Sequence, residues 1–181
     1  KPSGPVVTWT QSMHKVRLFS FSAALALLNL AHAEDVKQIP AGASNLEFPT
    51  LKGKSIRPLA CDSKETKFAV VVFTTTDCPI ANAYSPELNR LHQFITEKGG
   101  KLTLAHIDWD LTIEGAAEHA ADYALKPEIV IDRDHSLVRA TGAEITPDAV
   151  LISPAGEVVY RGRISNLFSD YGARRRVETD H

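Results

Sequence analysis

The residue in this sequence best suited to chemistry is Cys78, in the hexapeptide Thr-Asp-Cys-Pro-Ile-Ala. It follows a continuous apolar run at residues 68–73 and precedes a segment whose helical periodicity starts at Ile80. At a helix start, unpaired backbone N–H groups and the helix dipole favour the thiolate, the nucleophilic form of cysteine. Pro79 suits the first helical turn, because its missing N–H would be unpaired there. These features predict a nucleophile, although a buried apolar role for the thiol stays open.

Two further features bear on this thiol. Asp77 directly precedes it, and a carboxylate pointing inward would oppose ionisation of the sulfur. Thr146-Pro147 precedes a predicted strand at residues 149–152. Because proline cannot lie inside a central strand, Pro147 marks the start of that strand.

Cys61 is the other cysteine of the chain, and two roles stay open for it. It could resolve a sulfenic acid formed on Cys78, or it could be a loop thiol without a redox role. A disulfide needs Cα atoms within about 7 Å of each other. Because Cys61 precedes the strand that Cys78 follows, and such a strand spans about 20 Å, we expect the resolving thiol to come from another molecule.

Hydrophobic periodicity predicts the elements that position these residues. Strands are expected at residues 68–73, 102–108, 128–132, 149–152 and 157–163, with a short strand-turn-strand at 51–56. Helices are expected from residue 80 to the Gly99-Gly100 pair, at 114–123 and at 136–141. Strands joined by helices run parallel and the final hairpin antiparallel, which predicts one α/β domain with a central mixed sheet.

The first 33 residues are expected to lie outside this domain. Residues 1–12 precede the chain's one Met. A basic start, an apolar run and an Ala-His-Ala ending then make residues 13–33 typical of a secretory signal peptide, with an uncleaved membrane anchor as the alternative. The apolar run at 18–31 is shorter than the about 20 residues of a spanning helix. We therefore expect a periplasmic or extracellular protein without an integral membrane span in the mature chain.

Composition excludes several function classes. The net charge of −2 offers no electrostatic basis for binding nucleic acid. Two cysteines are too few for a disulfide scaffold, and 44% hydrophobic residues suffice for an ordinary core. We predict no cofactor and no metal: Asp132 to His135 has the composition of a metal site, but charges after a strand commonly cap the next helix. His119, in an Ala-rich helix, is expected at the surface.

Several motifs together carry a family resemblance. The octapeptide from Thr75 to Asn82, with Asp-Arg-Asp-His at residues 132–135 and Thr146-Pro147, resembles redoxin proteins of the AhpC/TSA (peroxiredoxin-like) type in the thioredoxin superfamily. The resemblance covers residues 46–172, leaving 34–45 as an extended leader and 173–181 as a tail. It implies a three-layer thioredoxin-like fold and a cis Thr-Pro bond against the active-site sulfur. Folds of this type close with a helix, so we expect the C-terminus to be incomplete and to leave out this last helix.

The resemblance also implies a thiol-dependent oxidoreductase with antioxidant or thiol-disulfide exchange activity. Its substrate would be a hydroperoxide or a protein disulfide, and an external thiol would be the reductant. Thr75 would hydrogen-bond the sulfur or the peroxide oxygen, and Pro147 would form the opposite wall. Ala81 stands where thioredoxins carry the second cysteine of C-x-x-C, which rules out a disulfide within the motif. A function of another class stays open, namely a non-catalytic domain that holds a partner segment beside Pro147.

Overall fold

The computed structural model describes residues 37–61 and 66–165. The predicted signal peptide and the predicted tail lie outside these residues. Within them, no helix has the length and apolar character needed to cross a membrane. The elements are β1 (Lys37–Gln38), the 3-10 helix η1 (Ala43–Asn45), β2 (Phe48–Pro49), β3 (Ser55–Ile56), β4 (Phe68–Thr74), α2 (Pro79–Ala83), α3 (Ser85–Glu97), β5 (Gly100–His106), α4 (Ile113–Asp122), β6 (Glu128–Ile131), α5 (Ser136–Thr141), β7 (Asp148–Ile152) and β8 (Glu157–Gly162).

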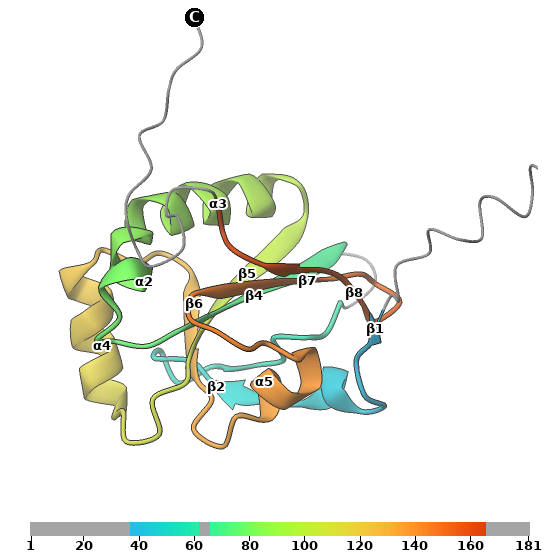
Figure 1. The fold of residues 1–181 in the computed structure, drawn as a ribbon, viewed down its shortest axis with the longest axis horizontal. Coiled ribbons are helices and arrows are strands. Elements are labelled where there is room, and N and C mark those ends of the chain that lie inside the picture. The colour runs from blue at the N-terminus through green and yellow to red at the C-terminus, as the bar shows by residue number, and fades with distance from the viewer. Residues whose placement is uncertain (1–36, 62–65, 166–181) are drawn as a thin grey trace, which may run out of the picture. The chain divides into compact units, whose positions relative to one another are not determined.

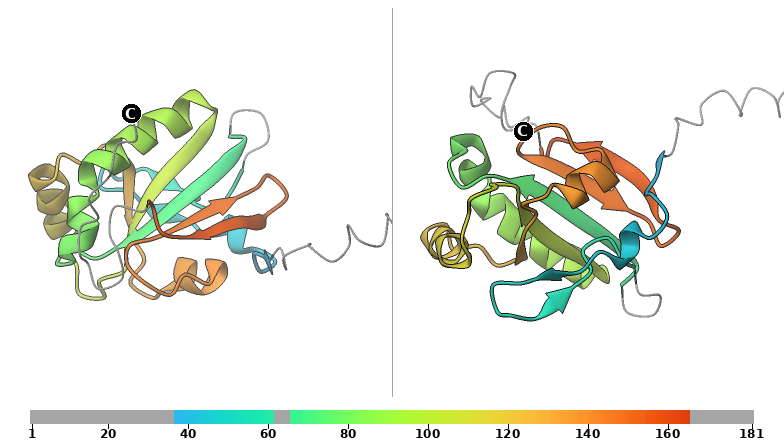
Figure 2. Two further views of the ribbon diagram at one scale, coloured as in Figure 1. Left: turned by 45° about the horizontal axis from the view of Figure 1, so that its top comes forward. Right: turned by 90° about the horizontal axis from the view of Figure 1, so that it is seen from below.

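A mixed sheet forms the centre of the domain, with strand order β1-β8-β7-β4-β5-β6. β4 pairs parallel with β5 and antiparallel with β7, and β7 pairs antiparallel with β8. Helix α3 lies on one side of the sheet and α5 on the other (Figures 1 and 2). This arrangement confirms the predicted α/β class with a mixed central sheet.

The alternation of side chains along β4 produces the three layers. Val71 packs in one apolar cluster with Leu137 of α5, and Val72 packs in a second cluster with Leu88 of α3. Successive side chains of a strand point to opposite faces, so an uninterrupted apolar strand needs a cover on both sides. The apolar sequence of β4 therefore specifies a central strand, and the short loop after this strand carries Cys78.

The predicted helix from residue 80 to the Gly99-Gly100 pair is instead two helices, divided at Tyr84. Pro86 has no N–H to donate to the carbonyl of Asn82, four residues earlier. The hydroxyl of Ser85 donates to that carbonyl instead, at 2.7 Å. This division makes α2 a short helix of its own directly after Cys78.

The N-terminal part of the domain differs from the sequence prediction in two places. The predicted leader at residues 34–45 contains β1, which pairs with β8, and η1, whose Ala43 is buried in the core. The strand-turn-strand predicted at 51–56 is a wider hairpin, β2 with β3, around a turn in which Gly53 has φ 76°. These strands are too short for periodicity to locate, whereas glycine marks the turn because it adopts positive φ without strain.

Candidate functional site

Cys78 is the N-cap residue of α2, with extended backbone at φ −78° and ψ 106°. The N–H of Ala81 donates to its Sγ at 3.5 Å, and Sγ lies 4.0 Å from the carbonyl oxygen of Thr146. The Thr146-Pro147 peptide bond is cis. The predictions that this bond is cis and lies close to the sulfur are both confirmed. The half-buried thiol thus has a donor on one side and a carbonyl on the other.

Strand pairing brings these two distant segments together. Phe73, near the end of β4, pairs with Asp148 at the start of β7. Pro147 immediately precedes β7, as predicted, and β4 leads into the loop that carries Cys78. Antiparallel pairing therefore places the segment after β4 next to the segment before β7.

The other predicted residues around the thiol are placed as follows. Thr75 is half-buried, and within the described part of the chain no hydrogen bond joins its hydroxyl to Cys78. Asp77 is exposed to solvent rather than turned into the site. Pro79 occupies the first turn of α2, as expected. The role of Thr75 towards a peroxide oxygen stays a prediction.

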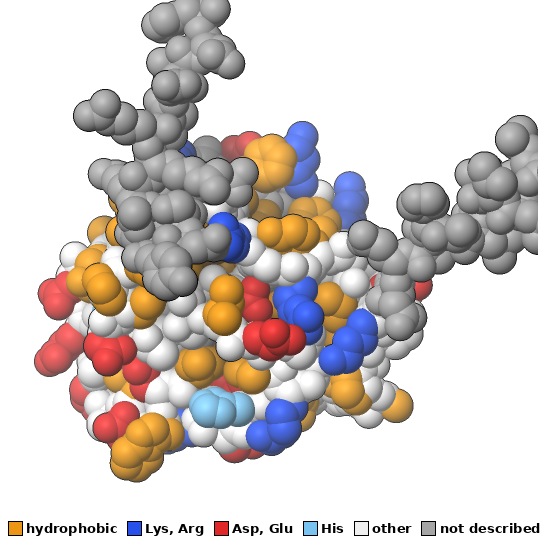
Figure 3. Space-filling model, in the orientation of Figure 1, with side chains coloured by type: hydrophobic (Ala, Val, Ile, Leu, Met, Phe, Trp, Pro, Cys, Tyr) orange, Lys and Arg blue, Asp and Glu red, His pale blue; other side chains and the backbone are white. Residues whose placement is uncertain are grey.

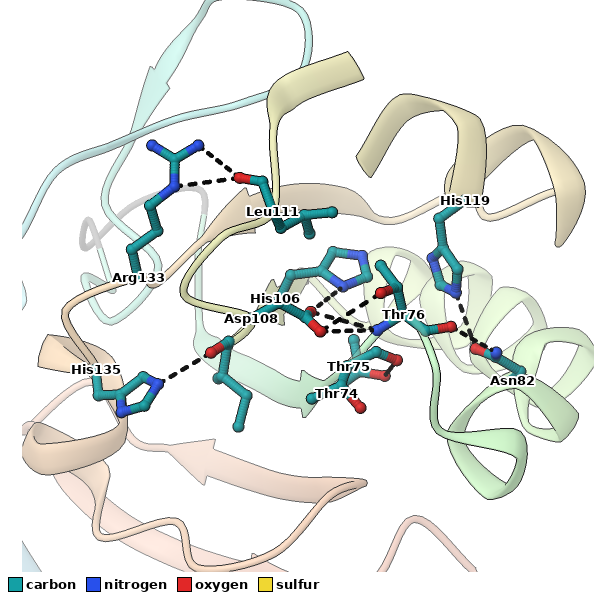
Figure 4. A network of polar contacts seen from close by, with 11 residues as sticks. Thr74, Thr75, Thr76, Asn82, His106, Asp108, Leu111, His119, Arg133 and His135 are labelled. Carbon is teal, nitrogen blue, oxygen red and sulfur yellow. Dashed lines mark hydrogen bonds and ion pairs between the residues drawn. The ribbon is translucent and has the colours of Figure 1, made fainter. Parts of the chain in front are cut away.

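The carboxylate of Asp108, which no sequence pattern had indicated, binds the backbone and the side chain of Thr76. Its backbone N–H lies 3.3 and 3.4 Å from the two carboxylate oxygens of Asp108, and its hydroxyl donates to one of them at 3.4 Å (Figure 4). Burial raises the pKa of Asp108, and the charge of Asp77 adds to this effect, while the hydrogen bonds from Thr76 act in the opposite direction. Asp108 thereby connects the segment after β5 to the loop that carries Cys78.

Two histidines complete this network. His119 was predicted at the surface but is buried, with its Nε2 2.9 Å from Oδ1 of Asn82. Its ring contacts the fully buried ring of His106 edge-on, with centroids 4.9 Å apart, and also packs against Tyr123. Asn82 in turn donates from Nδ2 to the carbonyl of Thr76 at 2.9 Å. The sequence signal for His119 is its position three residues after the buried Ala116, on the inner face of α4.

Burial keeps this histidine pair uncharged at neutral pH. It lowers the pKa of His106 from 6.5 to about 4, with a smaller contribution from His119. It also lowers the pKa of His119, against the opposing charges of Asp108 and Asp122. The carboxylate of Asp108 lies 3.6 Å from Nδ1 of His106, but removing an imidazolium from water is costly, so burial favours the neutral ring.

Acid should therefore destabilise the protein through His106. The unfolded chain binds a proton at this residue below pH 6.5, whereas the folded protein stays neutral there until about pH 4. Because the unfolded state takes up more protons in this window, the free energy of unfolding falls as the pH drops from 6.5 to 4, by about 3 kcal/mol. Urea unfolding at several pH values should show a clearly shallower pH dependence for His106→Leu. An identical slope in both proteins would contradict this expectation.

Cys61, the predicted candidate for a resolving residue, lies far from Cys78. Its Sγ contacts the carbonyl oxygen of Ile152 at 3.7 Å. Ile152 pairs with Ala69 at the beginning of β4, whereas Cys78 follows the end of that strand. The two cysteines are not bonded to each other and lie at opposite ends of the central strand.

Asp132, the first residue of the Asp-Arg-Asp-His segment, has a structural role. The Asp132 carboxylate accepts hydrogen bonds from the N–H groups of Leu137 and Val138, which is the helix-capping role that the sequence favoured over a metal site. No cluster of three His, Cys, Asp or Glu side chains that could hold a metal ion occurs in residues 37–61 and 66–165.

Acidic side chains gather along the surface of α4 (Figure 3), where Glu114, Glu118 and Asp122 are exposed.

Comparison with known proteins agrees with this geometry. Residues 37–173 match the Redoxin family. The chain belongs to the Redoxin family. As a member of this family it is a thiol oxidoreductase, and the predicted family relationship is confirmed. A search of curated protein sequences found no match.

Solved structures show the same fold at low sequence identity. A bacterioferritin comigratory protein from Xanthomonas campestris, described with alkyl peroxide reduction activity, is 20% identical, with a TM-score of 0.57 over 70% of this chain and 86% of that chain. A thiol-disulfide oxidoreductase from Bacteroides fragilis is 18% identical, with a TM-score of 0.57 over 71% and 92%. A secreted disulfide oxidoreductase from Mycobacterium tuberculosis is 18% identical, with a TM-score of 0.52 over 64% and 81%. These likenesses confirm the thioredoxin-like fold.

Proposed function

We propose that this Redoxin-family protein is an exported thiol peroxidase that uses Cys78 as its one nucleophile. The observation that carries the proposal is the position of Sγ, between the N–H of Ala81 and the carbonyl of Thr146 before the cis proline. A backbone N–H that donates to sulfur stabilises a thiolate more than a thiol, because a charged acceptor strengthens the hydrogen bond. The N–H of Ala81 thereby favours nucleophilic attack from Cys78, whereas the carbonyl of Thr146 accepts from the thiol form.

The residue at position 81 favours peroxide over disulfide as the substrate. A single-cysteine site that attacks a protein disulfide stops at a mixed disulfide unless a second thiol releases it. Ala81 occupies the position of the second cysteine of a C-x-x-C motif, and Cys61 lies at the far end of β4. Attack on a peroxide releases the reduced substrate in the same step, whereas attack on a disulfide leaves half of the substrate bound to Cys78, so peroxide reduction fits a single-cysteine site better.

The proposed peroxidase reaction begins and ends with the free thiolate of Cys78. The Cys78 thiolate attacks the terminal oxygen of a hydroperoxide, the O–O bond breaks, and the alcohol or water leaves with a proton, so that sulfur becomes a sulfenic acid. An external thiol attacks this sulfur and releases water, which leaves a mixed disulfide. A second thiol releases Cys78 and carries away the oxidised reductant as a disulfide.

The surroundings of the thiol support a small neutral substrate. Pro147 and the carbonyl of Thr146 form one wall of the site, and the hydroxyl of Thr75 is the candidate donor to a peroxide oxygen. The exposed acidic side chains of α4 disfavour anionic substrates at low ionic strength, but they act little on a neutral hydroperoxide. Export is supported by the signal-like sequence at residues 13–33 and by the secreted relative from Mycobacterium tuberculosis.

The direct test is chemical trapping of the oxidised sulfur. Reduced protein is treated with one equivalent of hydrogen peroxide in the presence of dimedone, and the adduct is located by peptide mass mapping. We expect one adduct on Cys78, and none in Cys78→Ser. Labelling confined to Cys61, or no oxidation of the native protein, would reject the peroxidase and favour a binding domain that uses the surface beside Pro147.

A further inference from the structure

We propose that Asn82 and His119 are positioning residues for Cys78, because together they tie helix α4 to the loop that carries the thiol. The inference rests on the proposed role of Cys78 as nucleophile. Neither residue contacts the sulfur in the structure. Their side chains act through the backbone carbonyl of Thr76, as the close-up in Figure 4 shows.

Asn82 holds both carbonyl groups that flank the cysteine loop. Its backbone N–H donates to the carbonyl of Cys78 at 3.0 Å, an ordinary helical bond that Asn82→Ala would keep. Its side-chain Nδ2 donates to the carbonyl of Thr76 at 2.9 Å, and this is the bond that Asn82→Ala removes. The N–H of Thr76 is held separately by Asp108. The segment from Thr76 to Cys78 is therefore fixed at both of its ends, which sets the place of Sγ between Ala81 and Thr146.

His119 determines how the amide of Asn82 is oriented. Since Nδ2 of Asn82 donates to a carbonyl, its Oδ1 faces His119 and can only accept. Nε2 of His119 must then carry the proton, which fixes the tautomer of the ring. Its Nδ1 is buried and has no hydrogen-bond partner in the described part of the chain, so an alternative tautomer would leave the Asn82 oxygen without a donor. The orientation of Asn82 thus depends on a single buried N–H group.

Helix α3 offers a matched control for this pair. Asn89 connects α3 to the loop that follows α4 through its side chain: Nδ2 donates to the carbonyl of Ala124 at 2.9 Å, and Oδ1 accepts from the N–H of Lys126 at 2.8 Å. It therefore makes two side-chain hydrogen bonds, as Asn82 does, but both are to backbone groups and neither is to the cysteine loop. A loss of stability alone should follow from Asn89→Ala.

The first experiment compares Asn82→Ala with Asn89→Ala in the full chain. We expect Asn82→Ala to slow peroxide oxidation of Cys78 about tenfold and to lower kcat without raising KM for peroxide, because a displaced nucleophile loses its attack geometry. Asn89→Ala should stay within about twofold of the native rate. Urea unfolding, measured on both, separates stability from reactivity. Equal rates for the two variants would overturn the proposal.

The second experiment tests His119 by rescue. Glutamine places an amide nitrogen where Nε2 of His119 lies, so His119→Gln can still donate to Asn82, whereas His119→Leu cannot. We expect His119→Leu to react about as slowly as Asn82→Ala, and His119→Gln to recover most of the rate. Equal slowing in both His119 variants would contradict the inference. If Asn82→Ala does not fold, this pair of variants decides the question.

Iodoacetamide alkylation of Cys78 serves as a readout that does not depend on peroxidase activity. If native Cys78 fails to react with peroxide but the same variants still alter its alkylation rate, the proposed function fails and the positioning roles stand. If peroxide oxidation occurs in the native protein and none of the variants changes either rate, the proposed function stands and the positioning roles fail.

Discussion

Cys78→Ser is expected to abolish peroxide turnover, whereas Cys61→Ser should keep it within about twofold of the native rate. Without a thiolate the attacking atom is missing, so the loss at Cys78 should be on the order of a thousandfold or more. Cys61 should be dispensable because of its place: its Sγ lies by Ile152, which pairs with Ala69 at the opposite end of β4. Turnover is measured with hydrogen peroxide and an external dithiol.

The same geometry predicts the identity of the oxidised product. From Ala69 to the end of β4 the strand rises by roughly 16 Å, more than twice the Cα separation of about 7 Å that a disulfide permits. Peroxide should therefore yield a bond between Cys78 and a thiol of another molecule, visible on a non-reducing gel. An internal Cys61–Cys78 bridge in the peptide map, together with lost turnover in Cys61→Ser, would show a self-resolving two-cysteine enzyme instead.

Asp132→Ala is expected to cost the domain about 3 kcal/mol of unfolding free energy, since a helix cap and its buried donors are lost together. The buried carboxylate accepts from the N–H groups of Leu137 and Val138 and from the hydroxyl of Ser136, at 3.0 to 3.2 Å. Removing the carboxylate leaves these donors unpaired at the start of α5, where Leu137 is fully buried. Urea unfolding followed by circular dichroism measures the effect.

Asp134 provides the matched control on the same loop. It is exposed and accepts one long hydrogen bond, 3.4 Å, from the N–H of Ser136. Asp134→Ala should therefore change the unfolding free energy by no more than about 0.5 kcal/mol. A similar loss in both variants would mean that Asp132 does not act as a buried cap.

The sequence was sufficient to predict the central framework of this protein. The apolar run of β4, the Cys-Pro helix start and the proline before β7 each impose a local rule: burial on both faces, an N-cap, and a strand boundary. Such rules depend on neighbouring residues only. They located Cys78 and Pro147 correctly at the ends of two strands, and they assigned Asp132 to a helix cap.

Only the tertiary structure decided which residues surround the thiol. His106, Asp108 and His119 come from β5, the segment after it and α4, and no local pattern relates them to Thr76 or Asn82. The surface prediction for His119 was wrong because its Ala-rich helix has small side chains on several faces, so composition did not mark the buried face. The separation of the cysteines likewise depends on strand pairing, which places Ile152 beside Ala69. Local propensity determined the elements of the site, and long-range packing determined which polar groups meet there, because their contacts join residues far apart in the chain.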